Sequence, residues 1–166
     1  MIAQFPYSYQ VKCETCGGDK TRRPGCEAIT IMPAFALIGP TDIGKTYGLR
    51  HLLPNNILIR HMDDVRHIKP HHQHVIFDDI SYKFINTPET VIHLLDSDEA
   101  TSLRILRGVV HIPPHVTKWF THNDRDFIYP ILSSDRQREA IDRRITIYEV
   151  NSRDDVRTAI IRSIRS

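Results

Sequence analysis

The sequence lacks several features that would place it in a class at once. Its apolar runs are all far shorter than the about 20 residues of a membrane-spanning helix, and its start, MIAQFPYSYQVK, lacks the basic and then continuously apolar plan of a secretory signal. The formal net charge is only +2, too small to indicate a nucleic-acid partner by itself. We therefore expect an intracellular protein without a membrane partner, and 166 residues with 40% hydrophobic content suit one globular domain with a real core.

Cysteine is also scarce, and all three cysteines, Cys13, Cys16 and Cys26, lie in the segment CETCGGDKTRRPGC. Cys-x-x-Cys followed by glycines resembles a zinc knuckle, but a tetrahedral structural zinc site needs four ligands. A histidine such as His51 could complete the set, although the pattern does not fix it. We favour a reduced glycine-rich segment over a zinc site. Residues 1–33 are interpreted as a leader with this knuckle-like segment, not as a separate domain.

From residue 34 onward, short apolar segments alternate with stretches of helical pattern. The run AFALI (34–38) is continuously apolar, as expected for a strand buried on both faces. This alternation predicts an α/β fold with a mostly parallel five-stranded sheet flanked by helices, formed by residues 34–150 and followed by an amphipathic helix within 151–166. The expected strands are 34–38, 56–61, 74–80, 117–123 and 144–150, the expected helices are 44–53, 87–97 and 153–164, and a hairpin is expected at 102–112.

The stretch LIGPTDIGKTYGLR (37–50) sets Gly-x-x-x-x-Gly-Lys-Thr between the first strand and the first helix. Backbone N–H groups in such a turn can surround phosphate oxygens, and the helix N-terminus adds partial positive charge. Lys45 would reach the β- and γ-phosphates, and Thr46 would place its hydroxyl on magnesium. The sequence therefore predicts a site for ATP and Mg²⁺, with the nucleotide held by Gly39, Pro40, Thr41, Asp42, Ile43, Gly44, Lys45 and Thr46.

Two further strands end in polar residues that suit the same chemistry. The segment VIFDD (75–79) delivers two carboxylates to the carboxyl edge of the sheet, where open α/β sheets bind their ligands. Asp78 would hold the magnesium, and Asp79 would polarise the water that attacks the γ-phosphate. The segment WFTHN (119–123) ends in Asn123, whose amide could sense the γ-phosphate and orient that water, or could serve as a turn or cap residue.

The ordered set GPTDIGKT, VIFDD, LRGVVHIPPHVTKWFTHN and AIDRRITIYEV resembles the ATPase domain of superfamily 3 viral helicases. It is most similar to the replication initiator (Rep) proteins of circular single-stranded DNA viruses, over residues 34–150. The resemblance implies an AAA+-like P-loop NTPase that hydrolyses ATP to translocate on or unwind DNA during viral genome replication. It also implies a homo-oligomeric ring, a hexamer, and a place in the host nucleus if the virus infects a eukaryote.

The resemblance assigns basic residues beyond the nucleotide site. Arg143 and Arg144, just before the last strand, become candidates for an arginine finger that acts on the ATP of a neighbouring subunit. Arg104, Arg107 and Lys118 would face a central channel and contact the DNA backbone. The residues alone also allow a solvated helix end for the first pair and a charged edge hairpin for Arg104 and Arg107.

The sequence departs from the family pattern in three respects. The lysine common at the hairpin tip is Arg107, and the serine before Asn123 is replaced by His122. The nicking domain of full-length initiators needs a histidine pair and a tyrosine nucleophile, which residues 1–33 cannot provide. We therefore expect no nicking or ligation by this chain and a separate nicking domain or protein.

Other interpretations stay open. An RNA helicase of the same superfamily, a small-molecule kinase, and a non-catalytic fragment that binds nucleotide or DNA would all carry parts of these motifs, and we favour DNA over RNA. The histidine-rich stretch HMDDVRHIKPHHQH (61–74) is interpreted as a solvated loop, because Pro70 interrupts it and its spacing matches no compact zinc motif. Trp119 is expected in the core.

Overall fold

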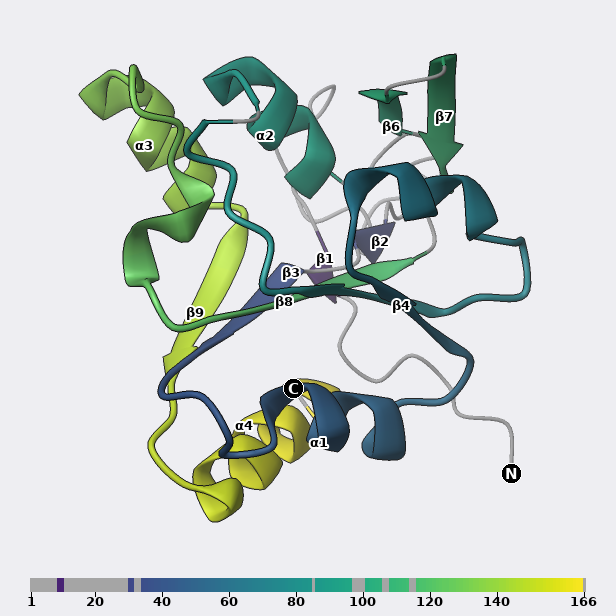
Figure 1. The fold of residues 1–166 in the computed structure, drawn as a ribbon, viewed down its shortest axis with the longest axis vertical. Coiled ribbons are helices and arrows are strands. Elements are labelled where there is room, and N and C mark those ends of the chain that lie inside the picture. The colour runs from purple at the N-terminus through teal and green to yellow at the C-terminus, as the bar shows by residue number, and fades with distance from the viewer. Residues whose placement is uncertain are drawn as a thin grey trace, which may run out of the picture.

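A five-stranded parallel sheet forms the centre of the molecule (Figure 1). The computed structural model describes residues 9–10, 30–31, 34–84, 86–96, 101–105, 108–113 and 116–165. All neighbouring strands in the sheet pair in parallel, in the order β4-β5-β8-β3-β9, so the predicted α/β fold is confirmed and the main sheet is entirely parallel. Its strands are β3 (Ala34–Ile38), β4 (Asn56–Ile59), β5 (His74–Asp78), β8 (Thr117–His122) and β9 (Ile145–Glu149).

Two antiparallel pairs accompany the sheet. β1 (Tyr9–Gln10) pairs with β2 (Thr30–Ile31), and β6 (Thr101–Ile105) pairs with β7 (Gly108–Ile112). The second pair is the hairpin that the sequence predicts at 102–112.

The helices start at recognisable signals. α1 (Lys45–Leu52) follows Gly44, whose φ of 80° is left-handed. α2 (Pro88–Leu95) is capped by Thr87 and has proline at its first position, as predicted. α3 (Asp135–Asp142), which was not predicted from the sequence, starts with a capping box between Ser134 and Gln137. The remaining helices are α4 (Arg153–Arg165) and two 3₁₀ segments, η1 (Met62–His67) and η2 (Arg125–Ile128).

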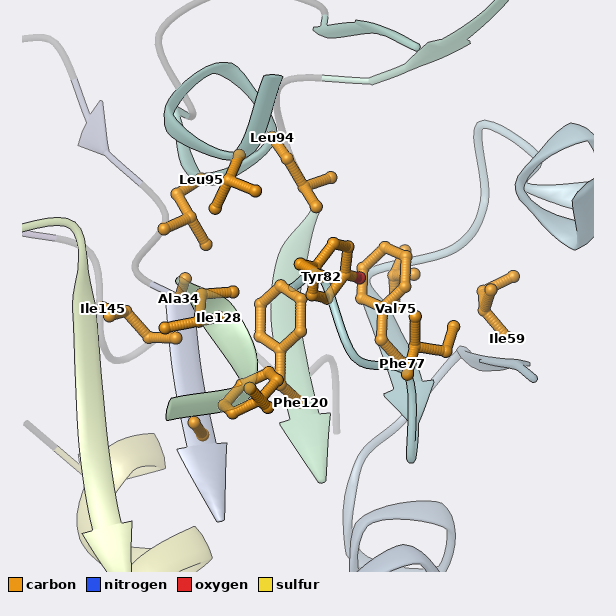
Figure 2. Packing of buried hydrophobic residues seen from close by; sticks show 14 of the residues in the cluster. Ala34, Ile59, Val75, Phe77, Tyr82, Leu94, Leu95, Phe120, Ile128 and Ile145 are labelled. Atoms are coloured by element: carbon orange, nitrogen blue, oxygen red, sulfur yellow. The ribbon is translucent and has the colours of Figure 1, made fainter. Parts of the chain in front are cut away.

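Helices cover both faces of the sheet, because its strands are apolar on both sides. α1 and α4 lie on one face, whereas α2, α3 and the β6–β7 hairpin lie beyond the other (Figure 1). Alternate residues divide between these two cores: Phe35 and Leu37 belong to the cluster with α1 and α4, and Ala34 and Ala36 to the other. Figure 2 shows the cluster that contains Ala34, on the face of the sheet covered by α2, with Leu94 and Leu95 of α2 directed toward the sheet.

Trp119 lies in the core, as predicted, and it fixes a histidine there. It is fully buried, and its Nε1 donates a hydrogen bond to Nδ1 of His74, 3.1 Å away. His74 is buried at the start of β5, and residues Met62–His67 form η1 with Val65 buried, so the interpretation of 61–74 as a solvated loop is wrong for these residues. His61, His67 and His71 are exposed, in agreement with it. Burial lowers the pKa of His74 to about 4, so its ring stays neutral near pH 7.

None of the helices in the described residues is both long and apolar enough to cross a membrane. The division at residue 33 stays a prediction, because most of residues 1–33 lie outside the described part of the chain.

Candidate nucleotide site

The predicted motifs meet in one pocket at the carboxyl edge of the sheet. β8 lies between β3 and β5, so the segments that follow these three strands are neighbours. The pocket has a volume of about 330 Å³. It is lined by Thr41, Asp42, Gly44, Lys45, Thr46, Tyr47, Asp78, Asp79, Thr121, His122 and Asn123. Eight of the predicted nucleotide and catalytic residues are thus brought together: Thr41, Asp42, Gly44, Lys45, Thr46, Asp78, Asp79 and Asn123.

The glycine-rich loop has a backbone shape that requires glycine at two positions. Asp42 and Gly44 have φ angles of 64° and 80°, and such left-handed residues turn successive N–H groups toward a common concavity. Gly39 packs so closely against the chain after β9 that an added Cβ would lie 1.9 Å from the carbonyl oxygen of Val150. Both motif glycines are therefore required by the geometry of the loop. Pro40 is exposed, and Ile43 packs against the α1–α4 core.

Lys45 lies back over this loop. Its Nζ donates hydrogen bonds to the carbonyl oxygens of Gly39, at 2.7 Å, and Pro40, at 2.5 Å. Partial burial lowers its pKa from the ordinary 10.5, while the charges of Asp79, Asp78 and Asp42 raise it. Because its partners are two neutral carbonyls, an anionic ligand in the pocket can compete for this ammonium group.

Asp78 and Thr46 form a compact set of oxygen atoms. The Thr46 hydroxyl donates to Oδ1 of Asp78 at 2.6 Å, and the Thr121 hydroxyl donates to the same oxygen at 2.9 Å. With its proton directed at Asp78, the Thr46 oxygen keeps lone pairs for a cation. Hard oxygen donors of this kind, few in number and beside the glycine-rich loop, fit Mg²⁺ rather than zinc. The donor set therefore suits the predicted magnesium.

Two residues that contact Asp78 were not predicted from the sequence. Thr121 is buried and polar in an otherwise apolar strand, a signal that could have identified it. Arg60, just after β4, has its Nε 3.6 Å from Oδ2 of Asp78. It is mostly exposed, and nothing in its local sequence indicates this contact, which depends on the pairing of β4 with β5.

Asp79 and Asn123 line the same pocket from β5 and β8. Asp79 has a left-handed φ of 54°, and its backbone N–H donates to the carbonyl of Thr121 at 2.9 Å. This contact directs its carboxylate away from the core, with the side chain 75% exposed. Nε2 of His122 lies 3.6 Å from Oδ1 of Asp79. Asn123 is exposed at the pocket rim. The cap of η2 is Asp124, so the alternative of a cap role for Asn123 is wrong, whereas its roles with a ligand or in a turn stay predictions.

A second pocket of about 720 Å³ adjoins the first, between α1 and α4. The two share Asp42, Gly44 and Tyr47. The exposed Tyr47 ring stacks on His51, with centroids 5.7 Å apart and planes within 7°. The rest of the second pocket is lined by apolar and basic residues together with a glycine: Ile43, Gly48, His51, Leu52, Arg153, Val156 and Arg157. The sequence could not predict this pocket, because it depends on how α4 packs against α1.

Lys118 does not lie on the surface. It is 1% exposed, its Nζ donates to the carbonyl of Asp96 at 2.9 Å, and burial lowers its pKa to about 8. The prediction that Lys118 contacts the DNA backbone is therefore wrong, because β8 is a central strand with both faces covered. For Arg104, the structure describes its place in β6 but not its side chain, and Arg107 lies outside the described residues.

The two arginine-finger candidates differ in their surroundings. Arg144 Nε lies 2.6 Å from Oδ1 of Asp96, and its guanidinium also donates to the carbonyl of Ala140. Arg143 is 72% exposed, with only a 3.7 Å ion pair to Glu139 on the same helix turn. Of the two, Arg143 is the one whose guanidinium can readily reach outward.

The segment with Cys13, Cys16 and Cys26 lies outside the described residues, so the preference for a reduced segment over a zinc site stays a prediction. Within the described ranges, no group of three or more His, Cys, Asp or Glu side chains could hold a metal ion.

Comparisons with known proteins find no matching family model and no matching curated protein. Among solved structures, the chain is similar to the apo A form of the C-terminal region of NrS-1, with 17% sequence identity and a TM-score of 0.39. The match covers 80% of this chain and 34% of that region, so the chain spans about a third of its length.

Proposed function

We propose that this chain is an ATP- and magnesium-dependent motor domain of the superfamily 3 helicase type, which hydrolyses ATP to move along or unwind DNA in viral genome replication. The observation that carries the proposal is the convergence of Lys45, Thr46, Asp78, Asp79 and Asn123 on one pocket. These residues come from α1 and from the ends of two other elements, so their meeting is not a consequence of sequence proximity.

The side chains that line the two adjoining pockets support a nucleotide as the ligand. A nucleoside triphosphate has a polyanionic end and a planar aromatic end. The first pocket offers the loop amides and Lys45 to the phosphates, and the second offers the Tyr47 ring and the apolar side chains of α1 and α4 to the nucleoside. On binding, Lys45 would exchange the carbonyls of Gly39 and Pro40 for phosphate oxygens, a charge-assisted contact.

The acids and the amide have separate tasks in the proposed hydrolysis. Thr46 and Asp78 would hold Mg²⁺, which neutralises charge on the β- and γ-phosphates when bound. Asp79 would accept a proton from the attacking water, whose oxygen bonds to the γ-phosphorus as the bond to the bridging β–γ oxygen breaks. ADP and phosphate are the products. Asn123, at the same rim, would orient the water through its amide.

Two further parts of the proposed motor are an arginine finger at the interface between subunits and basic residues that contact DNA. Arg143 is the better finger candidate, because Arg144 is occupied by Asp96. In a homo-oligomeric ring, Arg143 would stabilise charge on the γ-phosphate held by its neighbour. Arg104 and Arg107, from the β6–β7 hairpin, are the proposed contacts to the DNA backbone.

The test is ATP turnover with Mg²⁺ over a range of protein concentrations, alone and with single-stranded DNA or RNA. The proposal expects turnover that rises with DNA and rises more steeply than linearly with protein. A greater stimulation by RNA would favour an RNA helicase, transfer of phosphate to a small acceptor would favour a kinase, and tight nucleotide binding without turnover would favour a non-catalytic fragment.

A mixing experiment tests the shared site directly. Arg143→Ala lacks the finger and Asp79→Asn lacks the base, so each alone should be nearly inactive. Mixed rings should regain turnover, because some interfaces then carry an intact Asp79 facing an intact Arg143. Absence of any recovery, with both variants assembled, would contradict a finger at Arg143.

A further inference from the structure

His122 ends β8 inside the candidate pocket, and its ring is held on two sides. It stacks on Phe127 with centroids 5.2 Å apart and planes within 10°. The backbone N–H of Asp124 donates to its Nδ1 at 2.9 Å. Asp124 is itself fixed, because its carboxylate pairs with Lys83 at 2.5 Å and accepts a hydrogen bond from the backbone of Asp126. The side chain of His122 is only 13% exposed.

These contacts determine which ring nitrogen carries the proton. A backbone N–H can only donate, so Nδ1 accepts, and the neutral ring must carry its proton on Nε2. Burial lowers the pKa of His122; the charges of Asp79 and Asp124 raise it, and those of Lys83 and Lys45 lower it. A neutral ring with this tautomer can donate from Nε2 but cannot take a proton there. His122 is therefore not a base for the attacking water.

The donor faces the carboxylate that most needs orientation. Nε2 lies 3.6 Å from Oδ1 of Asp79, too long for a hydrogen bond, but the Asp79 side chain is 75% exposed and free to rotate toward it. Catalytic hydrogen bonds in ligand-free sites are often long and shorten when substrate binds. An exposed aspartate without such a partner would sample several rotamers and face the water in only some of them.

We propose that His122 is a positioning residue for the hydrolytic step: its Nε2–H holds the Asp79 carboxylate toward the water at the γ-phosphate. This inference rests on the proposed ATPase function and deepens it. The stack on Phe127 and the hydrogen bond from Asp124 set the plane of the ring. The remaining donor, Nε2–H, then lies beside the carboxylate of Asp79.

The test replaces His122 by Gln and by Asn, because the side-chain amides of these two residues reach the positions of Nε2 and Nδ1, respectively. In His122→Gln, the side-chain amide reaches about as far as Nε2 and can still donate to Asp79. In His122→Asn, the shorter side chain reaches only the place of Nδ1, so it can accept from Asp124 but no longer reaches Asp79. Both variants lose the stack on Phe127, which makes each the control for the other.

The expected result is a fall in kcat of about 10- to 100-fold for His122→Asn, by analogy with the loss seen when a hydrogen-bond partner that orients a metal ligand is removed. The KM for ATP should change little, and His122→Gln should recover most of the loss. In an Asp79→Asn background, His122→Asn should add no further loss, because the group it positions is gone.

Each other outcome contradicts a particular claim. Equal losses in the Asn and Gln variants, or an additive loss in the Asp79→Asn background, would overturn the positioning role. Unchanged kcat in His122→Asn would do so too, as would a loss matched by lower melting temperature and weaker binding of a fluorescent ATP analogue. If the wild-type chain binds nucleotide but hydrolyses none with or without DNA, the proposed function itself fails, a result that the wild-type assay separates from the others.

Discussion

Lys45 and Lys118 lie at opposite edges of the same sheet, and both were predicted to contact a ligand, ATP for Lys45 and DNA for Lys118. At the carboxyl edge, Lys45 is half-buried and bonds two loop carbonyls inside an open pocket. Near the amino edge, Lys118 is buried and bonds the carbonyl of Asp96, which also pairs with Arg144. The partners of Lys45 are accessible loop carbonyls that an anionic ligand could replace, whereas the partner of Lys118 is enclosed and holds the fold together.

Removing the ammonium group at the carboxyl edge should have the largest effect. Lys45→Ala removes the ammonium group that bonds the carbonyls of the glycine-rich loop, so under the proposed function we expect ATP turnover to fall by about 10²–10³-fold, as for loss of one donor that stabilises transition-state charge. The melting temperature should barely change, because Lys45 contacts only loop carbonyls. Steady-state turnover and thermal melts measure both effects. Turnover close to that of the wild type would contradict the nucleotide site.

The same change at the amino edge should affect stability instead. Lys118→Ala removes a buried stem and its hydrogen bond to Asp96, and we expect the free energy of unfolding to fall by about 2–4 kcal/mol. Lys118→Met keeps the volume of the stem and should recover much of this loss. Denaturant unfolding measures the difference. If Lys118→Met instead weakened binding to single-stranded DNA and lowered its salt dependence, the structural assignment of Lys118 would be wrong.

The pH dependence of stability sharpens the contrast. Burial lowers the pKa of Lys118 to about 8 from the ordinary 10.5, so between these values the unfolded chain binds a proton that the folded chain has released. Raising the pH then favours the folded state. Between pH 8 and 9.5, the wild type should gain about 1–2 kcal/mol relative to Lys118→Met, in which this group is absent. Parallel stability curves for the two proteins would contradict the burial of a titrating amine.

The smallest effect should separate the two neighbouring arginines. Arg144→Ala breaks a half-exposed ion pair with Asp96 and should lower the free energy of unfolding by about 1 kcal/mol. Arg143→Ala removes a mostly exposed guanidinium and should change it by less than about 0.5 kcal/mol. Urea unfolding of the two variants side by side checks this order, and a reversed order would contradict the Asp96 contact.

The carboxyl edge could be predicted because its signals are local. An apolar strand, a loop with Gly39 and Gly44, and a helix beginning at Lys45 are contiguous, and each element follows from short-range preferences. The contacts of Asp78 and Asp79 needed one further rule, that the carboxyl ends of parallel strands share an edge. α3 was missed although its capping box was present in the sequence, since Ser134 and Gln137 also fit an ordinary loop.

The amino edge could not be predicted in the same way. Lys118 stands in an apolar strand, and the family resemblance favoured an exposed position over the buried one that its neighbours indicate. Its partner, Asp96, is 22 residues earlier in the chain, and local sequence does not encode which carbonyl a buried ammonium will meet. The burial of His74 likewise depends on Trp119, 45 residues away.

The sequence by itself determined the five strands of the main sheet, three of the helices, the α/β class and the glycine-rich loop between β3 and α1, because strand alternation, glycine and helix caps act over a few residues. Only the tertiary structure decided the strand order, which sets β8 between β3 and β5 and brings His122 to Asp79. It also decided that α4 packs on α1, which forms the second pocket. The physical reason is that burial and pairing between distant segments depend on how the faces of the whole sheet are covered, and this is a property of the packed molecule rather than of any one stretch.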